Sequence, residues 1–217
     1  MLGMIRANLI IFLIMSSLST NIGWSEETSD NENFIHFSGP HIYDYATFDW
    51  VENHPNGQLA EKGLLRYGIA DGLWERYHEN GQLFYKGLFV RGRYHDHWEH
   101  YYDNGQLAWK GFYKFGKGEG LFEYYYDSGQ LSTKEHYTDG KRDGLFEKYH
   151  KNGQLEKKVS YKGGNEFGLC EEYHENGKLR LAGIYQNGRR DGLWEYFKND
   201  GSLDKTITWK YGVVVKD

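Results

Sequence analysis

Proline and cysteine are nearly absent from this chain, which has two prolines and one cysteine among 217 residues. A lone cysteine, Cys170, cannot form an internal disulfide, so packing alone must hold the fold together. The mean hydropathy of -0.80 is too low for a membrane protein. An aromatic content of 18% is too high for a disordered chain. Many aromatics together with 28 glycines favour short strands separated by sharp turns.

Basic side chains are also in short supply. There are 26 lysines and arginines against 31 acidic residues, and the formal net charge is -5. This balance argues against nucleic acid and against an anionic membrane surface as partners, because both reward a basic protein. Helical periodicity is not evident, and the sequence has no phosphate-binding loop, GxSxG or CxxC motif. We therefore expect no cofactor, no bound metal and no catalytic machinery.

A hydrophobic run occurs at the start of the chain. Arg6 precedes the apolar stretch Leu9–Met15, which fades into small polar residues. This order is typical of a secretory signal peptide, predicted here over residues 1–25. Cleavage is expected after Ser25, with Ser19 as the other candidate. The run is shorter than the roughly 20 residues that span a bilayer, although an uncleaved anchor helix stays an alternative. The prediction is an exported protein, periplasmic or secreted.

Beyond this segment the sequence repeats itself. Each copy carries a glycine that is preceded by Asn, Ser or Asp, residue types that initiate tight reversals. A leucine follows two residues later in every copy. These glycines recur with a step of 24 residues, at Gly57, Gly81, Gly105, Gly129, Gly153, Gly177 and Gly201. A fixed period of this length indicates a stacked repeat array.

One copy shows how the unit is expected to fold. The stretch from Gln82 to Phe89 is a predicted strand, followed by a turn around Gly92 and a second strand from His97 to Tyr102. An Asn-Gly pair then closes the unit, as in a tight hairpin. The turn glycine never varies and predicts a positive φ at Gly68, Gly92, Gly116, Gly140, Gly164, Gly188 and Gly212. The predicted fold is all-β, an elongated single-layer antiparallel meander of 24-residue hairpin repeats.

The repeat phase also divides the chain. Residues 26–33 form a polar linker, and residues 34–54 a capping half-repeat at the N-terminal side. Tandem repeats fill residues 55–201, and residues 202–217 make a partial copy at the C-terminal side.

Two columns of the repeat predict how the array packs. One holds a large apolar side chain in most copies: Trp74, Trp98, Phe122, Phe146 and Trp194, with Cys170 as the exception. The other is a mid-strand glycine that leaves room for a neighbouring ring, at Gly63, Gly87, Gly111 and Gly183. Glu135, Val159 and Ile207 interrupt this second column. Cys170 is expected to be a small buried hydrophobe and not a nucleophile.

A third column is acidic and includes Glu75, Glu99 and Glu123. Equivalent strands of neighbouring repeats lie about 9.6 Å apart, twice the strand spacing, which is too far for a metal cluster or a catalytic carboxylate pair. Each carboxylate is therefore expected to accept a hydrogen bond from a turn amide or a tyrosine hydroxyl of its own unit.

With these columns in place, the chain resembles the MORN repeat variant family. The resemblance covers about Trp50 to Gly212. It rests on Tyr77-His78-Glu79-Asn80-Gly81-Gln82-Leu83 with Gly87, Phe89 and Gly92, on Leu121-Phe122-Glu123, and on Asp191-Gly192-Leu193-Trp194. It implies an elongated twisted sheet of hairpins and no catalytic residues. Bacterial members are often labelled YwqK-type antitoxins, which would imply a cytoplasmic toxin as partner. The copies depart from the pattern at Asp96 and His97 and around Glu166-Phe167.

Candidate functional residues lie where the copies differ. On the second strand they alternate with the glutamate column and project from the opposite face. A mixed surface of Tyr, His and charge is typical of protein contacts. The predicted binding residues are Arg76, His100, Tyr102, Tyr124, Tyr126 and His150. The cluster of His95, His97 and Glu99 shares one strand face, but its members splay too far apart for a metal unless the strand bulges.

These observations favour an exported, non-enzymatic repeat scaffold that binds a protein or a cell-envelope component. An antitoxin that neutralises a toxin is the first alternative. A carbohydrate-binding or accessory module is the second, because rows of aromatic rings can stack on sugars.

Overall fold

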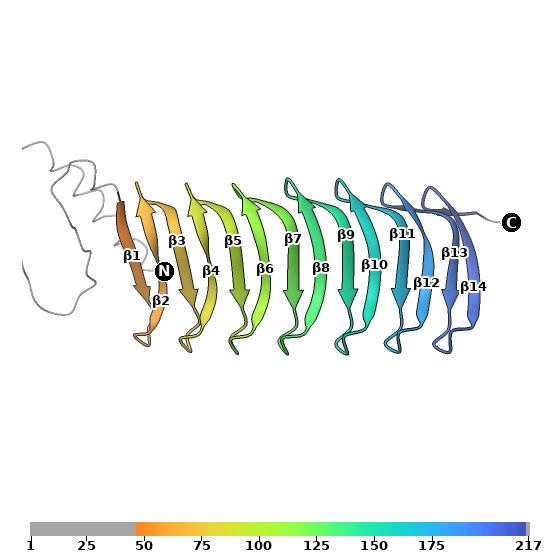
Figure 1. Ribbon diagram of the computed structural model, residues 1–217, viewed down its shortest axis with the longest axis horizontal. Coiled ribbons are helices and arrows are strands. Elements are labelled where there is room, and N and C mark those ends of the chain that lie inside the picture. The colour runs from red at the N-terminus through yellow and green to blue at the C-terminus, as the bar shows by residue number, and fades with distance from the viewer. Residues whose placement is uncertain (1–46, 216–217) are drawn as a thin grey trace, which may run out of the picture. The chain divides into compact units, whose positions relative to one another are not determined.

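The computed structural model describes residues 47–215 (Figure 1), where fifteen strands form one sheet in sequence order and every pair is antiparallel. The described residues contain no helix, so none crosses a membrane. The strands are β1 Thr47–Asn53, β2 Leu59–Arg66, β3 Ile69–Tyr77, β4 Leu83–Val90, β5 Arg93–Tyr101, β6 Leu107–Lys114, β7 Lys117–Tyr125, β8 Leu131–Thr138, β9 Lys141–Tyr149, β10 Leu155–Lys162, β11 Asn165–Tyr173, β12 Leu179–Gln186, β13 Arg189–Phe197, β14 Leu203–Lys210 and β15 Val213–Val214. The predicted hairpin meander is confirmed. The signal peptide, the linker and the first part of the capping half-repeat lie outside the described residues.

The two edges of the sheet use different turns. At one edge, two residues link the strands, and both have positive φ, as in Tyr67 (51°) and Gly68 (74°). This is the type I′ geometry whose twist matches a hairpin. At the other edge the Asn-Gly pair sits in a longer loop, where His78 N–H donates to Gln82 O at 2.7 Å. Only Gly81 has positive φ there, so the Asn-Gly pair does not form the two-residue turn that its sequence suggested.

The strands bend where the register shifts. Between β4 and β5, Gly87 lies opposite Trp98, but the next residue, Leu88, lies opposite His95. The pairing of β5 with β6 stays regular through this region. The second strand consequently begins at Arg93 and not near His97, because the expected turn continues as bulged strand. Bulges of this kind increase local bending and twist, and Figure 1 shows strongly curved strands.

The bend has a direction that the rings reveal. Tyr94 and Trp98 would be about 13 Å apart in a straight strand. Their ring centroids are 3.8 Å apart and stacked at 21°. The strand is therefore folded toward the face that carries these rings, which we call the inner face. The opposite face, which carries Glu75 and the rest of its column, is the outer face.

The core of the array lies on the inner face and is built from glycine and a ring. Trp98 is fully buried, and a Cβ placed on Gly87 would lie only 2.2 Å from its ring. The prediction that mid-strand glycine leaves room for a neighbouring ring is confirmed. The indole N–H of Trp98 donates to Leu88 O at 3.2 Å, next to the shift in register. Trp74 and Trp194 make the equivalent bonds.

One copy exchanges the sizes of the two partners. Val159 replaces the glycine, and opposite it Cys170 replaces the tryptophan. Both are buried, at 1% and 0% exposure, so the pair fills the same space with the volume redistributed. Burial raises the pKa of the Cys170 thiol to about 11, which keeps it protonated, as expected of a buried hydrophobe.

Candidate binding face

The predicted binding residues do lie on the inner face, and two of them pack into its layer of rings. His100 stacks on Trp109 with centroids 4.2 Å apart and an angle of 17°. Burial lowers the pKa of His100 to about 4, so the ring is neutral at pH 7. Tyr124 is half-buried one repeat further on, and burial raises the pKa of its phenol. Both side chains are only partly exposed.

Three other predicted binding residues connect one repeat to the next. The hydroxyls of Tyr102 and Tyr126 each donate at 2.7 Å to a backbone carbonyl 23 residues further on. The Nε2–H of His150 makes the same kind of bond to Tyr173 O at 2.9 Å. These side chains bridge successive loops, a contact that the sequence analysis missed. The signal was present as a column of hydrogen-bonding rings: His54, His78, Tyr102, Tyr126, His150 and His174.

The loop asparagines add a second bridge at the same edge. Asn80 Oδ1 accepts from Gln82 N–H at 3.0 Å and fixes its own turn. Its Nδ2 donates to Asp103 O of the next repeat at 2.6 Å. The asparagines at 56, 104, 152 and 176 repeat this pattern. Arg76 is the one predicted binding residue that is plainly exposed, opposite Glu61 and Tyr85.

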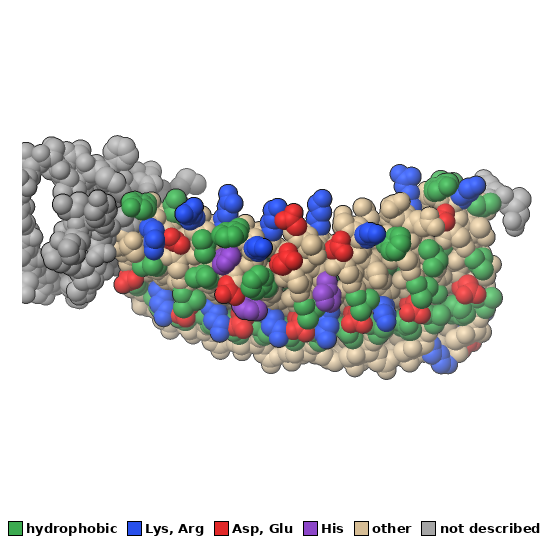
Figure 2. All heavy atoms as spheres, turned by 45° about the horizontal axis from the view of Figure 1, so that its top comes forward, with side chains coloured by type: hydrophobic (Ala, Val, Ile, Leu, Met, Phe, Trp, Pro, Cys, Tyr) green, Lys and Arg blue, Asp and Glu red, His purple; other side chains and the backbone are tan. Residues whose placement is uncertain are grey.

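The outer face carries a row of alternating charges (Figure 2). The hydroxyl of Tyr77 donates to Glu75 at 2.6 Å, which is one of the two partners expected for this column. The other partner was not expected: Lys62 on the preceding strand pairs with Glu75 at 2.7 Å. Hydrogen bonds from Lys62 and Tyr77 lower the pKa of Glu75, despite the opposing effect of burial. Tyr101 with Lys86, and Tyr125 with Lys110, serve Glu99 and Glu123 in the same way.

The histidine cluster is dispersed over the bend. His95 packs against Phe115 with ring centroids 4.6 Å apart, and His97 packs against Phe112 at 5.3 Å. Glu99 is engaged with Lys86 and Tyr101. Within residues 47–215, no group of three potential ligands is close enough to hold a metal ion.

The inner face changes character along the sheet. From β4 to β8 it is lined by closely spaced aromatic rings, for example Tyr113 at 5.2 Å from Phe122. From β8 onward ion pairs lie among the rings: Arg142 Nε lies 2.7 Å from the carboxylate of the buried Glu135. Further on, Lys157 Nζ lies 2.8 Å from Glu166, and the Tyr185 ring lies 5.1 Å from that of Trp194. The face thus offers a partner one region of aromatic rings and another in which rings and ion pairs are mixed.

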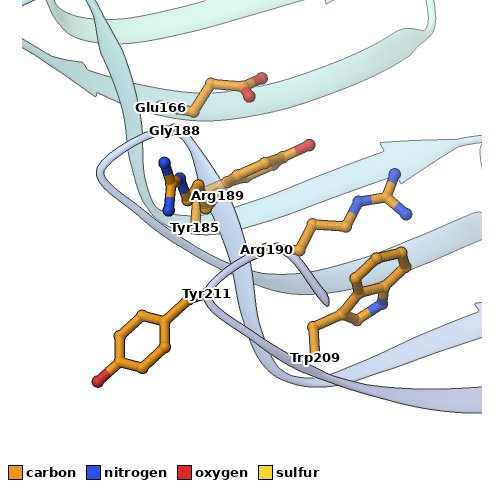
Figure 3. A pocket seen from close by; sticks show the side chains of 8 residues that line it. Glu166, Tyr185, Gly188, Arg189, Arg190, Trp209 and Tyr211 are labelled. Carbon is orange, nitrogen blue, oxygen red and sulfur yellow. The ribbon is translucent and has the colours of Figure 1, made fainter. Parts of the chain in front are cut away.

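Within residues 47–215, cavities open on this face, among them two of similar volume. The first, of about 450 Å³, is lined by Glu166, Tyr185, Gly188, Arg189, Arg190, Trp209, Tyr211 and Gly212. Figure 3 shows Arg190 extending alongside the Trp209 indole, whereas Tyr211 points away from both. The second, of about 460 Å³, is lined by Tyr113, Gly116, Lys117, Gly118, Phe122, Tyr124, Tyr137, Asp139, Gly140 and Lys141. Of the predicted binding residues, only Tyr124 lines one of these cavities.

Comparison with known proteins agrees with the repeat architecture. The family model described as MORN repeat variant matches five segments, at residues 70–91, 97–115, 118–139, 142–162 and 168–187. No curated protein matches the chain. The YwqK-type antitoxin label is therefore without support from a curated relative.

Proposed function

The chain belongs to the MORN repeat variant family, and from that premise we propose that it is a non-enzymatic scaffold that binds another protein through its inner face. The observation that carries the proposal is that the recurring columns and the variable columns of the repeat make different contacts. The recurring glycines, rings, asparagines and glutamates contact the sheet itself, as in the Gly87–Trp98 and Asn80–Asp103 pairs. Among the side chains that differ between copies, Arg76 is left exposed on the inner face.

Several features of this face suit protein recognition. Interface centres are enriched in tyrosine, tryptophan and arginine, and these are the residue types that gather here. A rigid sheet holds them in fixed positions, which limits the entropy lost on binding. The export signal predicted over residues 1–25 supports a partner in the cell envelope or outside the cell. We propose that this signal is cleaved after Ser25, with Ser19 as the other candidate.

The test is crosslinking in whole cells followed by capture of the tagged full chain. The informative variant combines Arg76→Ala, His100→Ala and Tyr124→Ala on the inner face. The control combines Leu121→Ala and Leu193→Ala, two outer-face side chains that are 40% and 53% exposed. We expect the inner-face variant to lose a specific crosslinked protein that the control retains.

Equal capture by both variants would reject the inner face as the binding surface. Binding of the wild-type chain to a glycan array, with no crosslinked protein, would favour the carbohydrate-binding alternative instead. Export has its own measurement, since mass spectrometry of the exported protein that finds an intact Met1 terminus would reject cleavage.

A further inference from the structure

One column of the inner face lies beside the large apolar residue of each repeat. It is found near the start of the second strand of each hairpin, four positions before that residue. The column reads Ala70, Tyr94, Gly118, Arg142, Glu166 and Arg190. Tyr94 stacks on Trp98. Nothing in the repeat pattern fixes the chemistry of this position.

Arginine fills the column twice, each time between two rings. The guanidinium carbon of Arg190 lies 4.3 Å from the ring centroid of Trp194 and 5.2 Å from that of Trp209. Its Nη1 donates to the hydroxyl of Tyr196 at 2.9 Å. Arg142 lies 5.6 Å from Phe146 and 5.4 Å from Tyr161. Each of these arginines lies between two aromatic rings, and we call such a site a guanidinium socket. The array fills two of these sockets with its own side chains.

The repeat at Gly118 has the same pair of rings, without the arginine and without the carboxylate of Glu135 that pairs with Arg142. Phe122 and Tyr137 stand where Phe146 and Tyr161 hold Arg142 in the next repeat, so the two ring types are identical. Tyr124 stands in the column of Tyr196, whose hydroxyl receives the hydrogen bond from Arg190. Because Gly118 has no side chain, this socket opens into the cavity of about 460 Å³.

We propose that the Gly118 socket receives the guanidinium of an arginine side chain from the protein partner. This inference rests on the proposed function of the inner face and names the group that the face recognises. Phe122 and Tyr137 would flank the guanidinium, and the hydroxyl of Tyr124 would accept one of its N–H groups. The net charge of -5 favours a basic segment, and of the two lysines that line the cavity, Lys117 and Lys141, Lys117 is paired with Asp139 at 2.6 Å.

The direct test uses a tripeptide probe, N-acetyl-Gly-Arg-Gly-amide, titrated into the full chain and followed by NMR of the tyrosine and phenylalanine rings. Citrulline in place of arginine keeps the shape of the probe and removes its charge. We expect the arginine probe to shift the resonances of Tyr113, Tyr124 and Tyr137, and the citrulline probe to bind at least about ten-fold more weakly. Equal affinities, or tighter binding of a phenylalanine probe, would overturn the assignment.

Filling the socket from within gives the matched variant. Gly118→Arg places in the socket the residue that its neighbour repeat carries at 142, and the backbone at 118 does not need positive φ. Thr138→Arg adds the same charge at an exposed position on β8. We expect Gly118→Arg to abolish binding of the arginine probe and Thr138→Arg to retain it. Undiminished binding to Gly118→Arg would refute the proposal.

A second variant removes a ring without adding a side chain: Tyr137→Leu is expected to weaken binding of the arginine probe by about ten-fold. Because it also removes the hydrogen bond of 2.7 Å from the Tyr137 hydroxyl to the buried Glu135, the urea midpoints of both variants are measured to show that each one folds. Crosslinking in whole cells distinguishes a failure of the socket from a failure of the inner face as the binding surface. Capture that survives Gly118→Arg but is lost from the Arg76, His100 and Tyr124 variant rejects the socket and keeps the scaffold. Capture that survives both rejects the inner face altogether.

Discussion

Replacing Gly87 by alanine should destabilise the array although alanine is ordinarily the better residue in a strand. Gly87 does not have positive φ, so its backbone would accept a side chain. The release of unfolded-state entropy alone would stabilise the variant by about 0.5–1 kcal/mol. The added Cβ, however, would lie 2.2 Å from Cδ2 of Trp98, whereas ordinary contacts begin at 3.4 Å. The ring must therefore move by about 1.2 Å, the difference between these two distances.

The cost of that movement has two parts. Overpacking a filled core typically costs about 1–3 kcal/mol, and Trp98 is fully buried. Moving the ring also strains the bond of 3.2 Å from its indole N–H to Leu88 O, which is worth about 1 kcal/mol. After the entropic gain is subtracted, the expected loss is about 2 kcal/mol. That would lower the urea midpoint by roughly 1 M.

The assay is equilibrium urea unfolding, followed by circular dichroism for the whole sheet and by tryptophan fluorescence for the core. Gly118→Ala is the graded control, because its Cβ would lie 3.1 Å from Phe122 and needs a shift of only a few tenths of an ångström. We expect it to change stability by less than about 1 kcal/mol. A urea midpoint for Gly87→Ala at or above that of the wild type would show that the array does not need a glycine at position 87 to make room for the Trp98 ring.

The natural exchange of sizes provides the rescue. Combining Gly87→Val with Trp98→Cys copies the pair Val159 and Cys170. The double variant should lose less stability than the sum of the single variants, with a coupling of at least about 1 kcal/mol. Additive losses would show that glycine and ring are not matched to one another.

Three further predictions concern the bend, the loops and pH. Asp96 has a φ of 62° in a column that is otherwise glycine, so Asp96→Gly should stabilise by about 0.5–1 kcal/mol in urea unfolding; a loss would show that its carboxylate matters more than its backbone. Asn80→Ala removes the bond of 2.6 Å from its Nδ2 to Asp103 O and should lower the free energy of unfolding by about 1–2 kcal/mol. Ser128→Asn should raise it by creating an equivalent bond. Shifts of the two urea midpoints in the same direction would contradict this. Because burial lowers the pKa of His100 from 6.5 to about 4, the neutral ring stabilises the fold fully above pH 6.5, and this contribution is lost as the pH falls through about 4. The midpoint difference between wild type and His100→Phe should shrink or reverse over that range, and a pH-independent difference would count against the buried neutral ring.

The sequence predicted the features that depend on period and size. The step of 24 residues led to the meander, and the missing side chain at Gly87 led to a ring beside it. The bend escaped prediction because alternation assumes a regular strand. Alternation places Tyr94 on the same face as Trp98 but about 13 Å away, and only the shift in register brings the rings together.

The loop contacts were missed for a different reason. Tyr102 and His150 differ between copies in residue type, and that difference was taken as a sign of function. Both types nevertheless present a hydrogen-bond donor at a similar reach, and both bond a carbonyl 23 residues further on. A column can therefore vary in residue type while its physical role is constant, so variation alone is weak evidence for a binding site.

On the inner face, the column of Tyr94, Gly118 and Arg142 is a better candidate for the carrier of specificity than the other variable columns. Its members share no side-chain donor, no size and no charge, and their one constant bond, from a turn glycine N–H to their carbonyl, does not depend on the side chain. They decide what the column itself places against the ring four residues later, which is an aromatic at Trp98, a guanidinium at Phe146 and no side chain at Phe122. Because the repeat does not fix the side chain at this position beside a ring, the position can change the chemistry of the face. Different arrays built on the same repeat could recognise different partners by changing that one column.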